Sequence, residues 1–186
     1  VIGSVDYLSQ GRLVLGIGVG GAFIEEMRRE WVAAGVPTSE RGARLEETIQ
    51  ILRSLWTGGE VAYAGRHFQF DPVAVRPLPC NGSVPLLPAC HSHTGSELQL
   101  RRAARLGDGF ISITASPEEF GAVRSTVWSY AEEEGRDTSE FQSVFYMTVA
   151  LGSDPTKASE EADSFLLRYY GVNHWGDKWG PFGRPG

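Results

Sequence analysis

The chain has 186 residues, of which 41% are hydrophobic and 22% charged, as expected for one globular domain with a hydrophobic core. Its net charge of −6 argues against nucleic acid as a partner, because binding a phosphate backbone needs surplus Lys and Arg. No apolar run reaches the roughly 18–20 residues that span a bilayer, so we expect no membrane partner. Two cysteines, Cys80 and Cys90, make no framework of paired thiols, which favours a cytoplasmic location.

The first half of the chain predicts a strand, two helices and a small β-hairpin. These elements cover residues 12–18, 22–34, 41–56, and 61–63 with 67–70. The strand is an apolar run that glycines close, as in a buried strand of a parallel sheet. The second helix carries a single apolar face made by Leu45, Ile49, Leu52 and Trp56. We expect its charged residues Arg41, Arg44, Glu46 and Glu47 to form a solvated face with local ion pairs.

The second half predicts strands that alternate with helices. The strands cover residues 86–89, 110–113 and 144–151, and the helices cover residues 96–106, 116–134 and 154–171. Ser116 and Asp154 each precede a proline, which predicts a capped helix start at both places. The last helix is expected to turn five side chains inward: Ala158, Ala162, Phe165, Leu166 and Tyr169. This alternation predicts an α/β fold with parallel strands and crossover helices, either an open sheet or part of a barrel.

A glycine-rich segment follows the first predicted strand. Residues 16–21 match the G-x-G-x-x-G pattern of dinucleotide-binding sheets. That pattern also needs a second strand with an acidic end, yet the nearest candidate, Glu40, lies at a helix start. Two other interpretations stay open: the glycines allow a tight turn, or Gly18, Val19 and Gly20 form the floor for a flat cofactor ring. Such a floor suits the carboxyl end of a barrel strand, where barrel enzymes have their active sites.

Four segments carry a wider pattern through the chain. They cover residues 6–20, 35–58, 63–68 and 101–110. In order and spacing they resemble the luciferase-like monooxygenase family, beginning near its fourth barrel strand. The resemblance implies a partial (β/α)8 TIM barrel with a hairpin insertion, in which residues 1–186 form a single incomplete domain. We expect this domain to hold about strands 4 to 7, with three strands before Val1 and one after Gly186.

The resemblance also implies a function. Members of the family are oxidoreductases or monooxygenases that use the deazaflavin coenzyme F-420 (F420) or FMN. They transfer a hydride to a small organic substrate or insert oxygen into it. A homodimer of the full-length protein is compatible with the resemblance. The alternative is a non-catalytic barrel remnant that serves as a binding or packing module.

The same resemblance assigns a second group of cofactor-binding residues after the second main strand. In the family this loop and the next helix N-terminus hold the cofactor phosphate. The matching residues here are Ala89, Cys90, Thr94, Gly95 and Ser96. Relatives usually carry Gly-Gly at the positions of Ala89 and Cys90. The alternative to a phosphate-binding loop is an ordinary capped loop between strand and helix. Cys90, His91 and His93 suggest zinc as a weaker alternative that lacks a fourth ligand, and His93 could serve as a proton donor. The residues identify no catalytic group and favour no metal.

Overall fold

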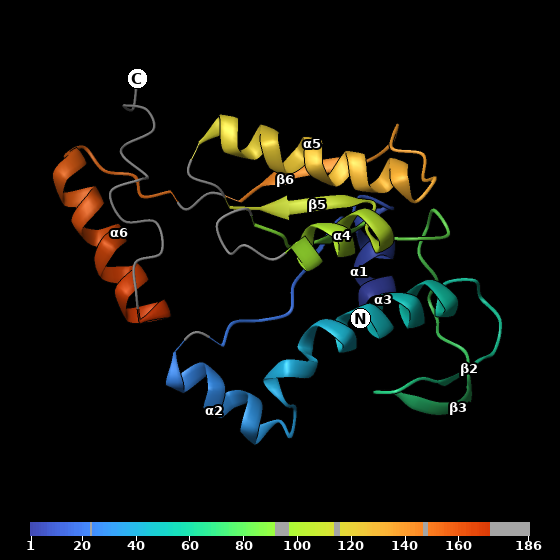
Figure 1. Ribbon diagram of the computed structural model, residues 1–186. Helices are drawn as coiled ribbons and strands as arrows, with labels where there is room; N and C mark the ends of the chain where they lie inside the picture. The colour runs from blue at the N-terminus through green and yellow to red at the C-terminus, as the bar shows by residue number, and fades with distance from the viewer. Residues whose placement is uncertain (23, 92–96, 114–115, 147–148, 172–186) are drawn as a thin grey trace.

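The computed structural model describes residues 1–22, 24–91, 97–113, 116–146 and 149–171 (Figure 1). Its helices are α1 (Ile2–Ser9), α2 (Glu25–Ala33), the 3₁₀ helix η1 (Thr38–Glu40), α3 (Arg41–Leu55), α4 (Glu97–Leu106), α5 (Pro117–Glu133) and α6 (Pro155–Tyr170). Its strands are β1 (Leu15–Ile17), β2 (Val61–Ala64), β3 (Gln69–Val73), β4 (Leu86–Pro88), β5 (Gly109–Ser112) and β6 (Gln142–Phe145). Within these residues no helix combines the length and apolar character needed to cross a membrane.

Four strands lie side by side in the order β1-β4-β5-β6, all parallel. Leu15 pairs with Leu86 between β1 and β4, and Phe110 pairs with Ser143 between β5 and β6. A bridge from Ala89 to Ile111 joins the two pairs. The α/β prediction is therefore confirmed. The interpretation of the glycine segment as a dinucleotide-binding site is wrong. Helices α2, η1 and α3 follow the glycines, and the strand that pairs with β1 is the distant β4.

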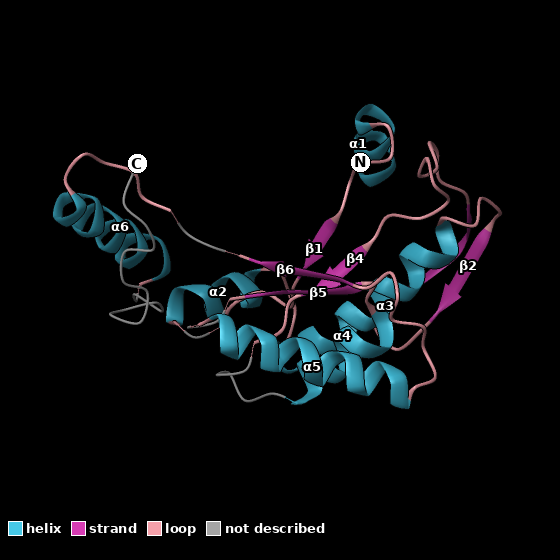
Figure 2. Cartoon of the chain, turned by 90° about the horizontal axis from the view of Figure 1, so that it is seen from above, coloured by secondary structure: helices cyan, strands magenta, loops and turns pink. Residues whose placement is uncertain are grey.

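The two faces of this sheet differ in what covers them. Helices α3, α4 and α5 lie along one face (Figure 2). Under α3, the predicted apolar face packs on Val84 and Leu86 through Leu45, Ile49, Leu52 and Trp56. Under α4 and α5, Phe110 and Cys90 join Ala103, Ala104, Val123, Val127 and Ala131 in a second cluster. Because side chains alternate along a strand, Gly16, Ala89 and Ile111 belong to the opposite face.

Helix α1 lies where no element was predicted. Its sequence begins Val1-Ile2-Gly3, which has low helix propensity and no capping side chain. Tertiary contacts stabilise it instead: the buried Asp6 accepts the backbone N–H of Cys80 at 2.8 Å. Helix propensity is a weak guide where such contacts decide the conformation.

Two predictions about the last elements are wrong. Strand β6 ends at Phe145, not residue 151, because its partner β5 offers only four residues to pair with. In α6 only Ala158 and Leu166 of the expected inward set are buried. Phe165 and Tyr169 are 52% and 66% exposed and stack on each other, and α6 stands apart from the sheet in both views (Figures 1 and 2).

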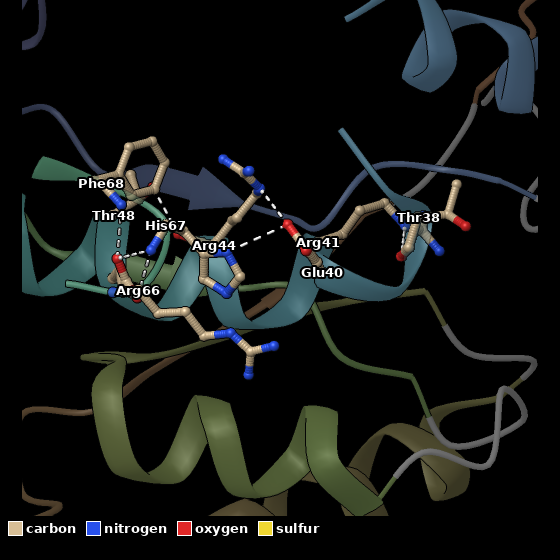
Figure 3. Close-up of polar contacts among 9 residues, drawn as sticks. Thr38, Glu40, Arg41, Arg44, Thr48, Arg66, His67 and Phe68 are labelled. Atoms are coloured by element: carbon tan, nitrogen blue, oxygen red, sulfur yellow. Dashed lines mark hydrogen bonds and ion pairs between the residues drawn. The ribbon is translucent and has the colours of Figure 1, made fainter. Parts of the chain in front are cut away.

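Side chains of α3 hold the β2–β3 hairpin, whose loop residues Arg66, His67 and Phe68 are labelled in Figure 3. Glu47 accepts the backbone N–H groups of Arg66, His67 and Phe68 at 2.9–3.2 Å. Burial raises the pKa of Glu47, but these donors lower it more, so the carboxyl ionises below its ordinary value of 4.5. The carboxylate thus supplies acceptors for a loop that would otherwise leave three backbone donors unpaired.

A Glu47→Gln variant is expected to be less stable than the parent at pH 7 and to lose that disadvantage in acid. The folded pKa of Glu47 is depressed, so its contribution is full above 4.5 and disappears as the pH falls through the folded pKa. Denaturant unfolding of both proteins between pH 3 and pH 7 checks this. Glu60→Gln, at an exposed glutamate before β2, is the control. A stability difference that does not depend on pH would contradict the assignment.

Candidate active site at the carboxyl ends of the strands

The carboxyl ends of β1, β4 and β5 meet at one edge of the sheet. The Ala89 N–H donates to the Ile17 carbonyl at 2.6 Å, and the Cys90 N–H donates to the Ile111 carbonyl at 3.1 Å. These bonds bring the predicted residues after β1 beside those after β4. Thr94, Gly95 and Ser96 lie outside the described residues, as does His93.

Small residues leave a bare strip on the face that the helices do not cover. The strip consists of Gly16, Gly18 and Ala89. A Cβ built on Gly18 would meet the Ala89 Cβ at 3.5 Å, and one built on Gly16 would meet Ile111 Cδ1 at 3.5 Å. Both are ordinary contacts, so the fold itself does not require glycine at either position. The strip can therefore accept a flat ring against the backbone. Sequence reasoning did not include Gly16 in the cofactor floor, although its place two residues before Gly18 in the same extended segment puts it on the same face.

Gly20 has a different role from Gly18. Its φ is +75°, and a Cβ there would lie 2.5 Å from Cζ2 of Trp31. The indole of Trp31 thus fills the space that a side chain would need. The structure explains Gly20 by the shape of the turn rather than by an open surface.

Three side chains from α2 and α3 hold this turn through its carbonyl groups. Trp31 Nε1 donates to Gly21 O at 2.7 Å, and Arg28 Nη1 donates to Ala22 O at 3.0 Å. Arg41 Nη1 donates to Gly20 O, 21 residues earlier in the chain. Arg41 was expected on a solvated helix face, and this long-range bond corrects that expectation.

The other charged residues of α3 divide between local and distant partners. Arg44 pairs with Glu40 at 3.2 Å, the local ion pair that the spacing predicts (Figure 3). Glu46 instead pairs with Arg102 and Arg105 of α4, with Arg102 at 3.1 Å. The buried His67 ring lies 3.3 Å from Glu40 through Nδ1. These contacts hold α3 against η1, α4 and the hairpin. None of them involves the residues at the carboxyl ends of the strands.

Cys90 does not turn its thiol toward the site. The residue is fully buried, and it packs in the core beneath α4 and α5. Burial raises the pKa of the Cys90 thiol to about 12. Its N–H is already taken by Ile111, so neither group is available to a phosphate. The zinc alternative loses its thiolate for the same reason, and among the described residues no three His, Cys, Asp or Glu side chains gather around a metal position.

The two cysteines are expected to react at very different rates with a thiol reagent such as DTNB at pH 8. Cys80 is exposed, whereas Cys90 is buried and its thiolate is disfavoured. One thiol should react within seconds to minutes and the second only after unfolding, as followed by absorbance. Cys80→Ser should remove the fast phase. Rapid reaction of both thiols in the native protein would show that Cys90 is accessible.

His91, which follows β4, contacts the residues at the carboxyl end of β5. Its Nδ1 accepts the Ile113 N–H at 3.2 Å and lies 3.4 Å from the hydroxyl of the buried Ser112. Because Nδ1 accepts a hydrogen bond, the neutral ring carries its proton on Nε2. Sequence reasoning identified His91 only as a metal ligand. The signal that was available was its position directly after a parallel strand.

Solved structures resemble this arrangement. An F420-dependent secondary alcohol dehydrogenase, solved with an F420–acetone adduct, matches with a TM-score of 0.70 and 22% identity. The match covers 90% of this chain and 48% of the dehydrogenase. The structural neighbours are luciferase-like TIM barrels, and the chain covers about half of each. The parallel strands β1, β4, β5 and β6 thus form part of a TIM-barrel-type fold, and their identity as strands 4 to 7 stays a prediction.

Sequence relatives lead to the same family. An F420-dependent glucose-6-phosphate dehydrogenase of Nocardia farcinica is 30% identical over 155 residues, which are 82% of this chain and 44% of the relative. A 5,10-methylenetetrahydromethanopterin reductase of Archaeoglobus fulgidus is 29% identical over 163 residues, 87% of this chain and 45% of the relative. The chain therefore spans just under half the length of these relatives. The family model for luciferase-like monooxygenases matches residues 1–184, and the chain belongs to that family.

Proposed function

We propose that the protein to which this chain belongs is an oxidoreductase that binds F420 or FMN at the carboxyl ends of β1, β4 and β5. One observation carries the proposal: the bare strip of Gly16, Gly18 and Ala89 at the edge where barrel enzymes bind their ligands. The relatives favour F420 over FMN, since the dehydrogenases among them are F420-dependent by name.

The cofactor would supply the redox chemistry, as hydride from a reduced deazaflavin or oxygen activation by a reduced flavin. The residues of this chain bind and orient it. Gly16 and Gly18 present backbone to one face of the ring, and Ile111 borders the strip with its apolar side chain. Gly20 and Val19 set the turn beyond the strip. The side chains of Ile17 and Cys90 point to the opposite, helix-covered face, where they pack in the core.

The cofactor phosphate is assigned to the loop before α4, through Thr94, Gly95 and Ser96. Free amides at a helix N-terminus favour an anion, and the Thr and Ser hydroxyls add donors. Glu97, in the first turn of α4, is engaged by Arg101 at 2.7 Å, which offsets its negative charge. Ala89 contributes a small side chain to the strip, while Cys90 contributes packing only.

The substrate class and surroundings follow from the same assignment. We propose a small organic substrate, because the relatives act on small molecules by name. Free Cys80 and Cys90 support a cytoplasmic protein. A homodimer of the full-length protein stays a prediction.

The test is a fluorescence titration of the full-length protein with F420 and, separately, with FMN, with NAD as the negative control. We expect saturable binding of F420 at one site per chain. With reduced F420 bound, a rise in the absorbance of oxidised F420 on adding a substrate would then report hydride transfer to that substrate. Binding of neither F420 nor FMN would contradict the proposal and favour a non-catalytic barrel remnant that acts as a binding or packing module.

A further inference from the structure

The turn after β1 is held by side chains from two helices, α2 and α3. Three consecutive carbonyls, those of Gly20, Gly21 and Ala22, each accept a side-chain N–H from a helix outside the turn. Glycine has the largest backbone freedom of any residue, so a run of glycines is free to adopt many shapes. The three bonds select one of them.

Arg41 and Trp31 form one unit in this arrangement. Arg41 is fixed twice, because its Nε donates to the Thr38 carbonyl at 2.8 Å while Nη1 donates to Gly20. Its guanidinium lies over the Trp31 ring, 5.6 Å from the ring centroid. Trp31 in turn occupies the space next to Gly20 and donates to Gly21. A change in either residue therefore disturbs the support of the other.

The carbonyl bonds determine which backbone groups the turn offers to a ligand. With the carbonyls of Gly20 and Gly21 directed to Arg41 and Trp31, those acceptors are occupied. Among the described residues, no acceptor takes the N–H of Val19, Gly20 or Gly21. The turn thus offers hydrogen-bond donors beside the bare strip, while its Gly20 and Gly21 carbonyls already accept bonds from the helices.

We propose that Arg41 and Trp31 are positioning residues, which hold the turn at residues 18–21 in the shape that the cofactor ring requires. This inference rests on the proposed function, because the shape of the turn matters for binding only if the ring lies beside it. Both residues act from the side of α2 and α3, through the turn, and neither belongs to the strip. Their effect should appear as a change in cofactor affinity without loss of the fold.

The experiment measures F420 affinity and thermal unfolding in the full-length protein. Arg41→Gln removes the charged donors, and Trp31→Phe removes the Nε1–H but keeps an aromatic ring. We expect Arg41→Gln to weaken F420 binding about tenfold, in keeping with the loss of one charge-assisted bond. Arg41→Lys should recover part of the affinity. Arg29→Gln is the matched control, since Arg29 is exposed on α2 and pairs with Glu25 at 3.5 Å.

A positioning role predicts that the effects of substituting Arg41 and Trp31 on F420 affinity are coupled. Because both residues support one turn, the double variant should lose less affinity than the product of the two single losses. If the two residues had a purely structural role, their substitution would lower the unfolding temperature. F420 affinity, measured well below that temperature, would then be unchanged. If the parent binds F420 and a folded Arg41→Gln variant binds it equally well, this inference is overturned alone. If the parent binds neither F420 nor FMN, the proposed function fails first and the inference fails with it.

Discussion

Replacing Phe110 with alanine is expected to destabilise the protein by about 3–5 kcal/mol, the loss typical of truncating a large buried aromatic side chain. Phe110 is fully buried on β5, on the face that α5 covers. Its ring centroid lies 5.3 Å from that of Phe120 and 6.0 Å from that of Trp128, the latter edge-on. The truncation would remove both aromatic contacts and open a cavity between sheet and helix, which rigid neighbours cannot fill.

Equilibrium unfolding in urea measures this loss as a lower midpoint with an unchanged slope. Leu98→Ala is the control, because Leu98 is a large apolar residue on α4 that is 71% exposed. A surface change of this kind stays within about 0.5 kcal/mol of the parent. A Phe110→Ala loss no greater than that of Leu98→Ala would mean that α5 does not pack on the sheet as described.

The elements that the sequence predicted well are those whose signals are local. Ser116 and Asp154 were expected to cap helices, and their side chains accept N–H bonds from Glu119 at 3.2 Å and Thr156 at 3.0 Å. The apolar face of α3 follows from spacing alone, since residues three and four apart lie on one side of a helix. The parallel sheet follows from the alternation of such elements.

The features that the sequence did not reveal depend on distant partners. Helix α1 needs Cys80, 74 residues away, to satisfy Asp6. Arg41 looked like a surface residue because nothing local shows that Gly20 lies within its reach. Strand β6 ends at Phe145, where its pairing with Ser112 of β5 ends. In each case a local pattern was overruled by a contact that only the fold creates.

The candidate site likewise has features that local sequence patterns indicate and features that depend on the fold. The small residues after β1 predict a cofactor surface at that edge, which stays a prediction. Strand alternation separates the two faces, with Gly16 and Gly18 on one side and Cys90 with Leu86 on the other. The predicted role of Cys90 failed because the loop was treated as a set of neighbours in sequence. In a strand extension, adjacent residues point to opposite faces, so Ala89 and Cys90 cannot serve the same surface.

A Gly18→Leu variant is expected to lose F420 affinity by about 100-fold, or about 2.7 kcal/mol, while its unfolding midpoint changes little. The backbone of Gly18 does not adopt a positive φ, and a Cβ there meets only Ala89 at an ordinary 3.5 Å. A Cβ therefore has room in the free protein, and the rest of the leucine side chain would stand on the exposed strip where the ring is proposed to lie. Gly18→Ala should show a smaller loss, because one methyl group covers less of the strip.

Gly59→Leu supplies the matched control for this prediction, since a Cβ at Gly59 would meet no atom within 4 Å and its φ is not positive. It makes the same chemical change far from the strand ends, so F420 affinity should equal that of the parent. Affinity and unfolding are measured on the same preparations, which separates occlusion from misfolding. If Gly18→Leu binds F420 as tightly as Gly59→Leu does, the ring does not rest on the strip. Gly16 and Gly18 would then matter only for the conformation of the chain around the turn. The cofactor surface would have to lie on another strand.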